Sequence, residues 1–323
     1  MNASFTPVSL DAEILQRMMT VSGVIGRLEG IHLVKPVPKL REQNRSRTVH
    51  GSTAIEGNPC TLQDVENIMQ GKPVLVSPSK LLEVKNALAA YDALRDFSPY
   101  DIAFFLRAHA ILMGGGLMLG PGLFRREPVE VYISETETRA MPPWRTVEPR
   151  MGELFAYLAA DADPLLLKSI RFHFECVNLH PFSDGNGRVA RLWQTRLLME
   201  AHPVFEFLDV ESMIYERRMD YYARICEAQA RGDAAGFVRF MLDRLIETLD
   251  RLWADGCNAV SGRDDRLQTA RAHFGNDSFT RKDYLSLFKT IVAVTASRDL
   301  KAGVDCGALD RQGDNCTAEY RFV

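Results

Sequence analysis

Hydrophobic residues recur with helical spacing along most of the 323-residue chain. Ser98 and Pro99 are typical of a helix start, and residues 101–113 after them place their apolar side chains on one face. The same spacing predicts further helices over 147–160, 164–179, 188–201, 212–230 and 233–253. Because the connections between them are short, the pattern predicts a compact and mainly α-helical bundle.

Three regions depart from this pattern. Residues 129–143 alternate apolar and polar positions before a polar tip and two prolines, which predicts a short exposed β-hairpin. Residues 254–265 are rich in Gly, Asp and Asn and are predicted to form a linker. The end of the chain predicts a helix, a turn, a helix and a strand pair around Gly313. The expected organisation is a helical region over 1–95, a core over 96–253, a linker over 254–265 and a small domain over 266–323.

Composition excludes several classes of protein. The chain is 46% hydrophobic and 25% charged, as is usual for soluble globular proteins, and its net charge of −3 creates no basic field for nucleic acid or an anionic membrane. It has no apolar run near the roughly 18 residues of a membrane span and no signal peptide, so a cytoplasmic protein is expected. Its six cysteines include no CxxC pair and favour free thiols, although a Cys306–Cys316 bridge is conceivable. The seven histidines form no HExxH-like zinc motif.

Residues 180–191 combine residue types that suit phosphate chemistry. They read His-Pro-Phe-Ser-Asp-Gly-Asn-Gly-Arg-Val-Ala-Arg and join two predicted helices. Gly185 and Gly187 permit a backbone whose N–H groups converge on one point, where the next helix adds the positive end of its dipole. Arg188 and Arg191 are unfavourable for that dipole by themselves, which indicates that an anion binds there.

The same segment supplies a base and a metal ligand. Asp184 suits Mg²⁺, which takes one or two carboxylates together with phosphate oxygens. His180 has a near-neutral pKa and can accept a proton from an attacking hydroxyl. A helix–loop–helix corner with a glycine cap would explain the glycines, but not the base, carboxylate and arginines together.

This segment resembles the signature of the Fic family, H-P-F-x-[D/E]-G-N-G-R-x-x-R, at every defined position. The resemblance implies a mostly helical Fic fold and transfer of AMP from ATP, with Mg²⁺, to a Tyr, Ser or Thr hydroxyl of a protein. It implies that His180 is the base, that Asp184 holds the metal and that Phe182 anchors the loop in the core. The nucleotide contacts that it implies are Gly185, Asn186, Gly187, Arg188 and Arg191. Relatives that phosphorylate carry Lys at the place of Gly187, so phosphorylation is not expected.

A second motif lies far upstream. Residues 52–58, Ser-Thr-Ala-Ile-Glu-Gly-Asn, resemble the family's inhibitory helix, [S/T]-x-x-x-E-[G/N], with Ser52, Glu56 and Gly57 at its defined positions. The resemblance implies that Glu56 pairs with Arg191 and takes the place of the γ-phosphate. From the residues alone, a surface glutamate before a glycine helix stop is the alternative. In some relatives the same glutamate orients a water that removes AMP, so de-AMPylation stays open.

Two further segments resemble parts of the family. The hairpin over 129–143, with residues 122–125 before it, is similar to the flap that aligns a target by main-chain pairing; an ordinary exposed hairpin is the alternative. Tyr222, next to Tyr221, is similar to the segment beside the adenine, although a core aromatic pair explains it nearly as well. The triple glycine at 114–116 is expected to stop a helix, and His109, His173 and His202 are expected to be structural.

The C-terminal domain over 266–323 resembles a winged helix-turn-helix, with residues 295–300 opening the recognition helix and Gly313 in the wing. DNA is a possible partner, but from Cys257 onward ten Lys/Arg face nine Asp/Glu, and Gly303 stands where such helices carry a large apolar residue. We therefore favour a protein contact, including a homodimer, over DNA. The modified protein could be a second protein or the chain itself. A regulator whose Fic core senses ATP is the non-enzymatic alternative.

Overall fold

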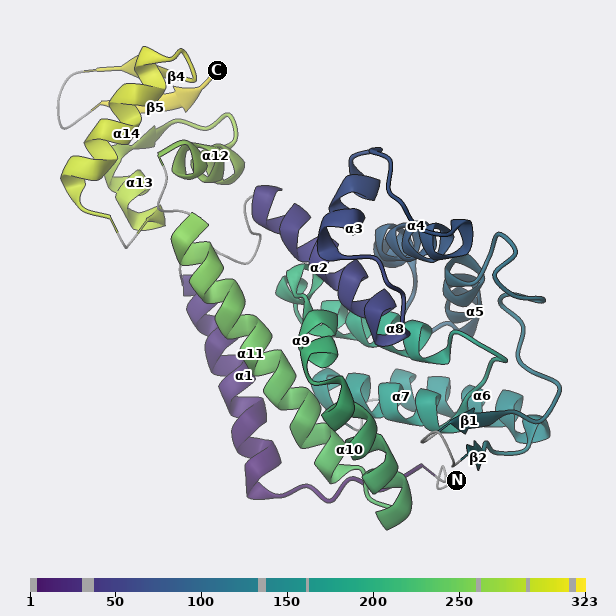
Figure 1. Ribbon diagram of the computed structural model, residues 1–323. Helices are drawn as coiled ribbons and strands as arrows, with labels where there is room; N and C mark the ends of the chain where they lie inside the picture. The colour runs from purple at the N-terminus through teal and green to yellow at the C-terminus, as the bar shows by residue number, and fades with distance from the viewer. Residues whose placement is uncertain are drawn as a thin grey trace. The chain divides into compact units, whose positions relative to one another are not determined.

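The computed structural model describes residues 5–30, 38–132, 138–160, 163–259, 263–288, 291–313 and 318–323. The chain divides into two compact units, which Figure 1 shows with their helices and strands. The larger unit comprises Met1–Val21 and Asn44–Thr248, and the smaller unit comprises Ser22–Gln43 and Leu249–Val323. The mainly helical fold predicted from the sequence is confirmed.

The larger unit is helical apart from one hairpin. Three helices contribute residues to both units: α1 (Ala12–Gly30), α2 (Pro38–Ile55) and α11 (Ala235–Ala259). The others are α3 (Leu62–Met69), α4 (Pro78–Ala93), α5 (Ile102–Leu112), α6 (Val147–Ala159), α7 (Leu165–Leu179), α8 (Asn186–Ala201), α9 (Val210–Glu216) and α10 (Arg218–Arg231). Short 3₁₀ helices η1 (Leu94–Asp96), η2 (Trp144–Thr146) and η3 (Pro203–Phe207) connect some of them. Strands β1 (Glu130–Tyr132) and β2 (Thr138–Ala140) pair antiparallel.

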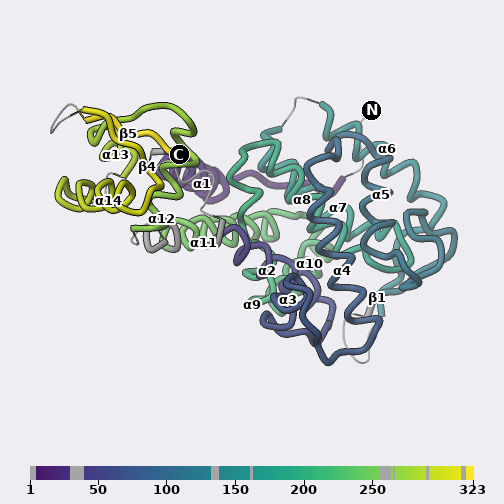
Figure 2. Tube along the Cα trace, turned by 90° about the horizontal axis from the view of Figure 1, so that it is seen from above, coloured from purple at the N-terminus to yellow at the C-terminus, as the bar shows by residue number. Residues whose placement is uncertain are grey.

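The core of the larger unit surrounds α7 and α8. These two helices pack against each other, with α6 against α7 and α5 against α8 (Figure 2). The ring of Trp193 in α8 is fully buried and contacts Phe105 of α5 and Phe155 of α6. Unusually for a central helix, α8 also buries Arg188, Arg191 and other polar residues. Buried cations in a core need partners of opposite charge, which directs attention to this helix.

Two predicted elements differ from the structure. The helix predicted over 212–230 is broken at Arg217, whose φ of −119° and ψ of 30° are not helical. The two pieces follow different partners, because Ser212 of α9 donates to the carbonyl of Arg47 in α2, whereas Tyr221 of α10 bonds to His173 in α7. Hydrophobic spacing does not register such a change of partner.

The linker predicted over 254–265 is the second difference. Helix α11 continues to Ala259 and α12 (Arg263–Phe274) begins at Arg263, so most of the predicted linker is helical. Residues 260–262 lie outside the described residues. Arg27 of α1 pairs with Asp250 at 3.4 Å and stacks on Trp253. This packing against α1 supports α11 near its end and outweighs the poor helix propensity of the residues that follow.

The smaller unit has its own core and a three-stranded sheet. Helices α13 (Arg281–Leu287) and α14 (Ala293–Asp305) accompany strands β3 (Phe279–Thr280), β4 (Leu309–Gln312) and β5 (Glu319–Phe322) in the antiparallel order β3-β5-β4. The two predicted helices and the strand pair are thus present. Gly303 leaves the space of a side chain to Leu309, whose Cδ1 lies 2.6 Å from where a Cβ would stand. The winged-helix assignment and its protein or DNA partner stay predictions. Residues 314–317, including Cys316, lie outside the described residues.

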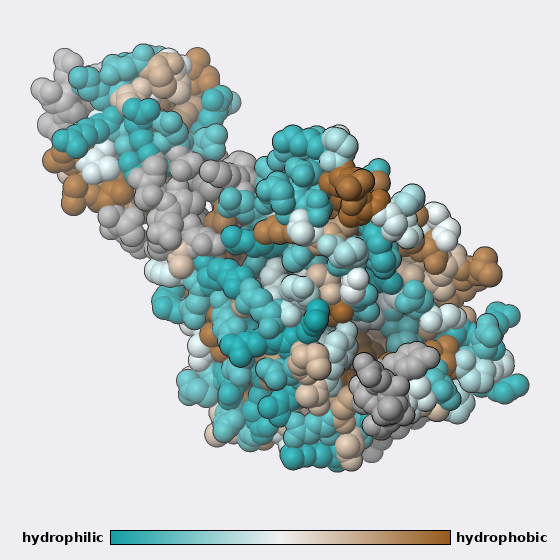
Figure 3. Space-filling model, in the orientation of Figure 1, coloured by the Kyte–Doolittle hydropathy of each residue, from teal (hydrophilic) through white to brown (hydrophobic). Residues whose placement is uncertain are grey.

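One face of the molecule is mostly polar. On the face in Figure 3, hydrophilic residues predominate and apolar residues form small separate patches. Within the part of the chain that the structure describes, no helix has both the length and the apolar character needed to cross a membrane.

Candidate functional site

The segment 180–185 forms a tight loop between α7 and α8. His180 ends α7 in the left-handed region, with φ 53° and ψ 62°, and Gly185 begins α8 with φ 78°. A Cβ on Gly185 would lie 2.6 Å from Sδ of Met113, so both the backbone and the space require glycine here. A strained backbone at a non-glycine residue is common at functional sites, and His180 is such a residue.

Phe182 and Asn186 hold this loop to the core. Phe182 is fully buried, as predicted, and its ring stacks on His109 with centroids 3.6 Å apart. The side chain of Asn186 accepts from the backbone N–H of Phe182 and donates to its carbonyl, both at 2.8 Å. Asn186, predicted as a nucleotide contact, therefore has its side chain engaged within the loop and offers its backbone N–H to a ligand.

The ring of His180 is held in its neutral form. Burial lowers its pKa, a hydrogen bond to the carbonyl of Val177 opposes this, and the charge of Arg125 lowers the pKa further. A neutral imidazole with one nitrogen bound to a carbonyl has its other nitrogen available as a proton acceptor. This is the protonation state that a general base needs at neutral pH.

Asp184 is the exposed carboxylate of the loop. Its Oδ1 accepts from the N–H of Gly185 at 2.6 Å and lies 3.6 Å from Nη2 of Arg188, and 64% of the side chain is exposed. Among the described residues, no group of three or more His, Cys, Asp or Glu could enclose a metal ion. One exposed carboxylate fits Mg²⁺ when phosphate oxygens and water complete the shell.

The first turn of α8 is an anion-binding geometry. The N–H groups at the start of a helix have no carbonyl acceptor within it, and here they belong to Asn186, Gly187 and Arg188. The side chains of Arg188 and Arg191 are 8% and 1% exposed, and the buried Nε atom of each has no hydrogen-bond partner in the described part of the chain. Two buried guanidinium groups at the positive end of a helix need a negative charge.

That charge comes from Glu56, just beyond the end of α2. Its Oε1 accepts from Nη2 of Arg191 at 2.7 Å, which confirms the predicted pair, and the same nitrogen donates to the carbonyl of Ser52 at 3.0 Å. Burial opposes ionisation of Glu56, but its pKa still lies below the ordinary value because Arg191, and then Arg188, stabilise the carboxylate. Gly57, at φ 81°, turns the chain directly after Glu56, so the glycine helix stop and the ion pair are both present.

The carboxylate of Glu56 also touches the turn itself. A Cβ on Gly187 would lie 2.5 Å from Oε1 of Glu56 and 3.0 Å from Nη1 of Arg191. An ionised carboxylate therefore lies against the first turn of α8, where a phosphate would be expected. Any side chain at position 187 would meet this ion pair.

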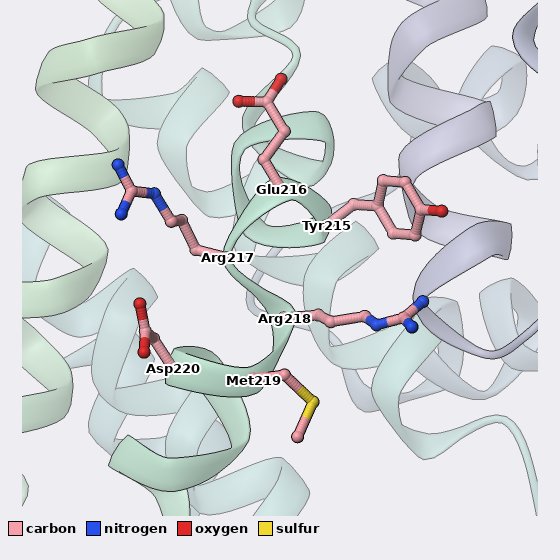
Figure 4. A pocket seen from close by; sticks show the side chains of 6 residues that line it. All are labelled: Tyr215, Glu216, Arg217, Arg218, Met219 and Asp220. Carbon is pink, nitrogen blue, oxygen red and sulfur yellow. The ribbon is translucent and has the colours of Figure 1, made fainter.

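Tyr222 lies beside the end of α2. It is 42% exposed, and its hydroxyl donates to the carbonyl of Ile55 at 3.4 Å. The chain before it forms a surface pocket of about 410 Å³, lined by Tyr215, Glu216, Arg217, Arg218, Met219 and Asp220 (Figure 4). Tyr215 and Arg218 point to the side of α2, where Tyr215 meets the ring of His50. Tyr221, in contrast, is buried against His173.

Sequence reasoning missed the role of Arg125 in shaping the loop. This buried residue donates to the carbonyl of His180 at 2.7 Å, to that of Glu127 at 3.0 Å and to that of Pro142 at 2.5 Å. Its own N–H donates to the carbonyl of Pro181 at 2.9 Å. One guanidinium thus ties the backbone of the catalytic candidate to both ends of the hairpin. The segment 122–125 is recognised as similar to the family flap, but its sequence does not indicate that Arg125 contacts several backbone carbonyls.

His109 is the second missed support. Its Nδ1 accepts from the N–H of Gly122 and its Nε2 contacts the carbonyl of Asp184, both at 2.9 Å. Burial lowers its pKa to about 4, so the ring is neutral. The prediction that His109 is structural holds in the sense that it supports the loop from beneath. The tip of the hairpin at 133–137 lies outside the described residues.

Comparisons with known proteins agree with this site. The sequence model of the Fic/DOC family matches residues 99–198. The protein adenylyltransferase Fic of Nematostella vectensis is 27% identical over 256 residues, which cover 75% of this chain and 56% of the relative. The protein adenylyltransferase Fic of Culex quinquefasciatus is 28% identical over 223 residues, which cover 64% of this chain and 41% of the relative. The chain thus spans about half the length of the curated relatives that it matches.

Solved structures extend the similarity to nearly the whole chain. A Fic family protein from Desulfovibrio desulfuricans G20 has a TM-score of 0.76 and 30% identity, with 98% of each chain covered. The Fic-1 fragment from C. elegans, at 23% identity and a TM-score of 0.61, shares the fold over 75% of this chain. With the signature loop, its supports and this full-length similarity together, the chain belongs to the Fic family.

Proposed function

We propose that this chain transfers AMP from ATP to a hydroxyl group of a protein and that Glu56 inhibits the transfer. The observation that carries the proposal is the ionised carboxylate of Glu56 on Arg191, against the first turn of α8. A site that already holds an anion beside a neutral histidine suits a nucleotide phosphate and a proton acceptor. The relatives named protein adenylyltransferase support the same reaction.

His180 acts on the target in this proposal. The oxygen of a Tyr, Ser or Thr side chain attacks the α-phosphorus of ATP, and the bond from that phosphorus to the β-phosphate oxygen breaks. Pyrophosphate leaves, and the proton of the hydroxyl passes to the free ring nitrogen of His180. The target is another protein or this chain itself, and the hairpin β1–β2 offers main-chain groups to align it.

The phosphates of ATP bind the first turn of α8. The N–H groups of Asn186, Gly187 and Arg188 and the guanidinium groups of Arg188 and Arg191 would contact their oxygens. Asp184 would hold Mg²⁺, which neutralises phosphate charge when bound. Tyr222 would lie near the adenine.

Glu56 inhibits by occupying Arg191. A γ-phosphate on this guanidinium would lie against the carboxylate, and the two anions would repel each other in the narrow space at Gly187. Ser52 contributes its carbonyl to the same nitrogen, and Gly57 fixes the turn that places Glu56. ATP therefore binds productively only when the end of α2 moves away.

Removal of AMP from a modified protein is a second candidate. Glu56 is ionised and 31% exposed, and its charge reaches His180. A carboxylate in this position can orient a water toward the phosphorus of a bound AMP group. Loss of AMP release in Glu56→Gly, with AMP transfer gained, would assign both reactions to one site.

The test compares intact masses after incubation with ATP and Mg²⁺. We expect Glu56→Gly to gain one or more AMP groups, and wild type to gain far fewer. His180→Ala in the Glu56→Gly background should bind ATP by calorimetry and gain none. Asp184→Ala in that background should gain few, with a higher requirement for Mg²⁺.

The matched control is Glu153→Gly, which changes an exposed glutamate of α6 in the same way. It should behave like wild type. If Glu56→Gly and Glu153→Gly bound ATP with equal affinity and neither was modified, autoinhibition by Glu56 would be wrong. If His180→Ala lost ATP binding together with transfer, the assignment of His180 as the base would be wrong.

A further inference from the structure

A buried cluster of hydroxyl and carboxyl groups lies behind the segment Ser52–Gly57. It joins four helices, with Ser52 from α2, Tyr91 from α4, Thr195 from α8 and Glu211 from α9. The hydroxyl of Tyr91 donates to Oε1 of Glu211 at 2.5 Å, and that of Thr195 donates to the same oxygen at 3.3 Å. Burial raises the pKa of Tyr91, and the neighbouring side chain of Ser52 in α2 lowers it. The cluster thus reaches α2 at Ser52.

Glu211 is costly to bury. The residue is 2% exposed, and its Oε2 has no hydrogen-bond partner among the described residues. Burial raises its pKa to about 7, although Tyr91 and Arg191 act in the opposite direction. A buried carboxyl group with an unpaired oxygen lowers the stability of the fold, so its retention suggests a role. The neighbours of Glu211 indicate that this role concerns α2.

The backbone of Glu211 touches α2 as well. A Cβ on Gly51 would lie 2.6 Å from the carbonyl carbon of Glu211 and from the nitrogen of Ser212. The hydroxyl of Ser212 donates to the carbonyl of Arg47 at 2.9 Å. Helix α2 therefore rests directly on the first turn of α9, one residue before Ser52.

We propose that Tyr91 and Glu211 are positioning residues of the inhibitory segment, which they hold in the conformation that places Glu56 on Arg191. This inference rests on the proposed function, because it gives the Glu56–Arg191 pair an inhibitory role. Nη2 of Arg191 bonds both to the carbonyl of Ser52 and to Glu56. Any displacement of Ser52 therefore disturbs the ion pair.

Substitutions of these two residues should differ in their effect on inhibition. Tyr91→Phe removes the hydroxyl that donates to Glu211 and lies next to Ser52. Glu211→Leu removes the acceptor, whereas Glu211→Gln keeps an oxygen that accepts from Tyr91. We therefore expect Tyr91→Phe and Glu211→Leu to release inhibition and Glu211→Gln to retain it.

The experiment measures self-modification by intact mass and ATP affinity by calorimetry, in full-length protein with and without Glu56→Gly. In the otherwise wild-type chain, Tyr91→Phe and Glu211→Leu should raise the rate by about three- to tenfold, the range that one or two hydrogen bonds can supply. In the Glu56→Gly background, where inhibition is already gone, the same changes should leave the rate within about twofold.

Tyr157→Phe is the matched control. The hydroxyl of Tyr157 in α6 also donates to a carboxylate, that of Asp163 at 2.7 Å, and the ring contacts Phe5 and Arg171. It should leave the rate unchanged in both backgrounds. Thermal unfolding of every variant separates loss of fold from loss of inhibition.

Three results would overturn the inference, two of them without touching the proposed function. An equal change in both backgrounds would place Tyr91 and Glu211 in the support of Arg191 rather than of Glu56. Unchanged rates in the wild-type background, with Glu56→Gly active, would reduce the cluster to a packing feature and leave the proposed function intact. An inactive Glu56→Gly would instead contradict the proposed function and this inference together.

Discussion

Glu56 and Arg191 are 135 residues apart in the chain, yet Oε1 of the first accepts from Nη2 of the second at 2.7 Å. The two side chains differ in exposure, since 31% of Glu56 and only 1% of Arg191 is accessible. Arg191 is fixed by α8 around it, whereas Glu56 belongs to the end of α2. We therefore expect a competing anion to displace Glu56 and to leave Arg191 in place.

Gly51→Ala should release inhibition. The new methyl group would lie 2.6 Å from the backbone of Glu211 and Ser212, and backbone atoms cannot give way as a flexible side chain can. Helix α2 must shift, at a cost of about 1–3 kcal/mol in the free energy of unfolding. We expect several-fold faster self-modification by intact mass and a lower midpoint in urea.

The control for this prediction is Gly152→Ala in α6, where no atom lies within 4 Å of the new methyl group. This change should stabilise the helix by about 0.5–1 kcal/mol and leave self-modification unchanged. If Gly51→Ala is destabilised but no more active than wild type, the packing of α2 on α9 does not maintain inhibition.

Arg125→Lys should slow transfer without weakening ATP binding. A single ammonium group cannot reach the carbonyls of His180, Glu127 and Pro142 that the guanidinium bridges. His180 would lose its fixed position, and errors near 1 Å can cost up to about 100-fold in rate. We expect a 10- to 100-fold lower rate in the Glu56→Gly background, with ATP affinity changed less than about twofold.

The exposed neighbour Arg126 provides the control for Arg125. Arg126→Lys should leave both the rate and the affinity unchanged. Equal losses of ATP affinity and rate in Arg125→Lys would assign the residue to nucleotide binding instead of to the placement of His180.

The ring of His180 should titrate below its ordinary pKa of 6.5. Burial lowers the pKa and Arg125 contributes, whereas Glu56 and Asp184 raise it. Removing the charge of Glu56 should therefore shift the titration of His180 to still lower pH. NMR titration of the histidine Cε1 protons, assigned with His180→Ala, measures this in wild type and in Glu56→Gly. A shift to higher pH in Glu56→Gly would contradict the described electrostatics.

Glu211→Gln should change how stability depends on pH. The pKa of Glu211 is about 7 in the fold, above its ordinary 4.5, so between these values the folded state binds more protons than the unfolded state. The free energy of unfolding of wild type therefore falls as the pH rises from about 4.5 to about 7. Above that pH, Glu211 causes no further loss. Glutamine does not titrate, so the variant should gain up to about 3 kcal/mol relative to wild type between pH 5 and pH 8.

Urea unfolding at the two pH values measures that difference. Tyr91 and Arg191, the charged or titratable groups that face Glu211, have raised pKa values and do not titrate in this window. A constant difference between variant and wild type would show that Glu211 is ionised at both pH values.

Much of the local structure follows from the sequence. The apolar spacing predicted α5, α6, α7 and α8 with nearly their observed bounds. Gly115 and Gly116, with positive φ, follow the end of α5 as the predicted helix stop. These features depend on contacts between residues a few positions apart, which a sequence displays directly. The resemblance of two motifs to a family added the pairing of Glu56 with Arg191.

The tertiary structure decided which groups meet. The partners of Arg125 at His180, of Tyr91 at Glu211 and of His173 at Tyr221 lie 48 to 120 residues away. No spacing rule predicts such contacts, because they depend on how whole helices pack. The break at Arg217, the extension of α11 to Ala259 and the inward side chain of Asn186 have the same origin. The sequence by itself determined the chemical groups and the helices that carry them, whereas packing determined their partners, their protonation and their exposure to solvent.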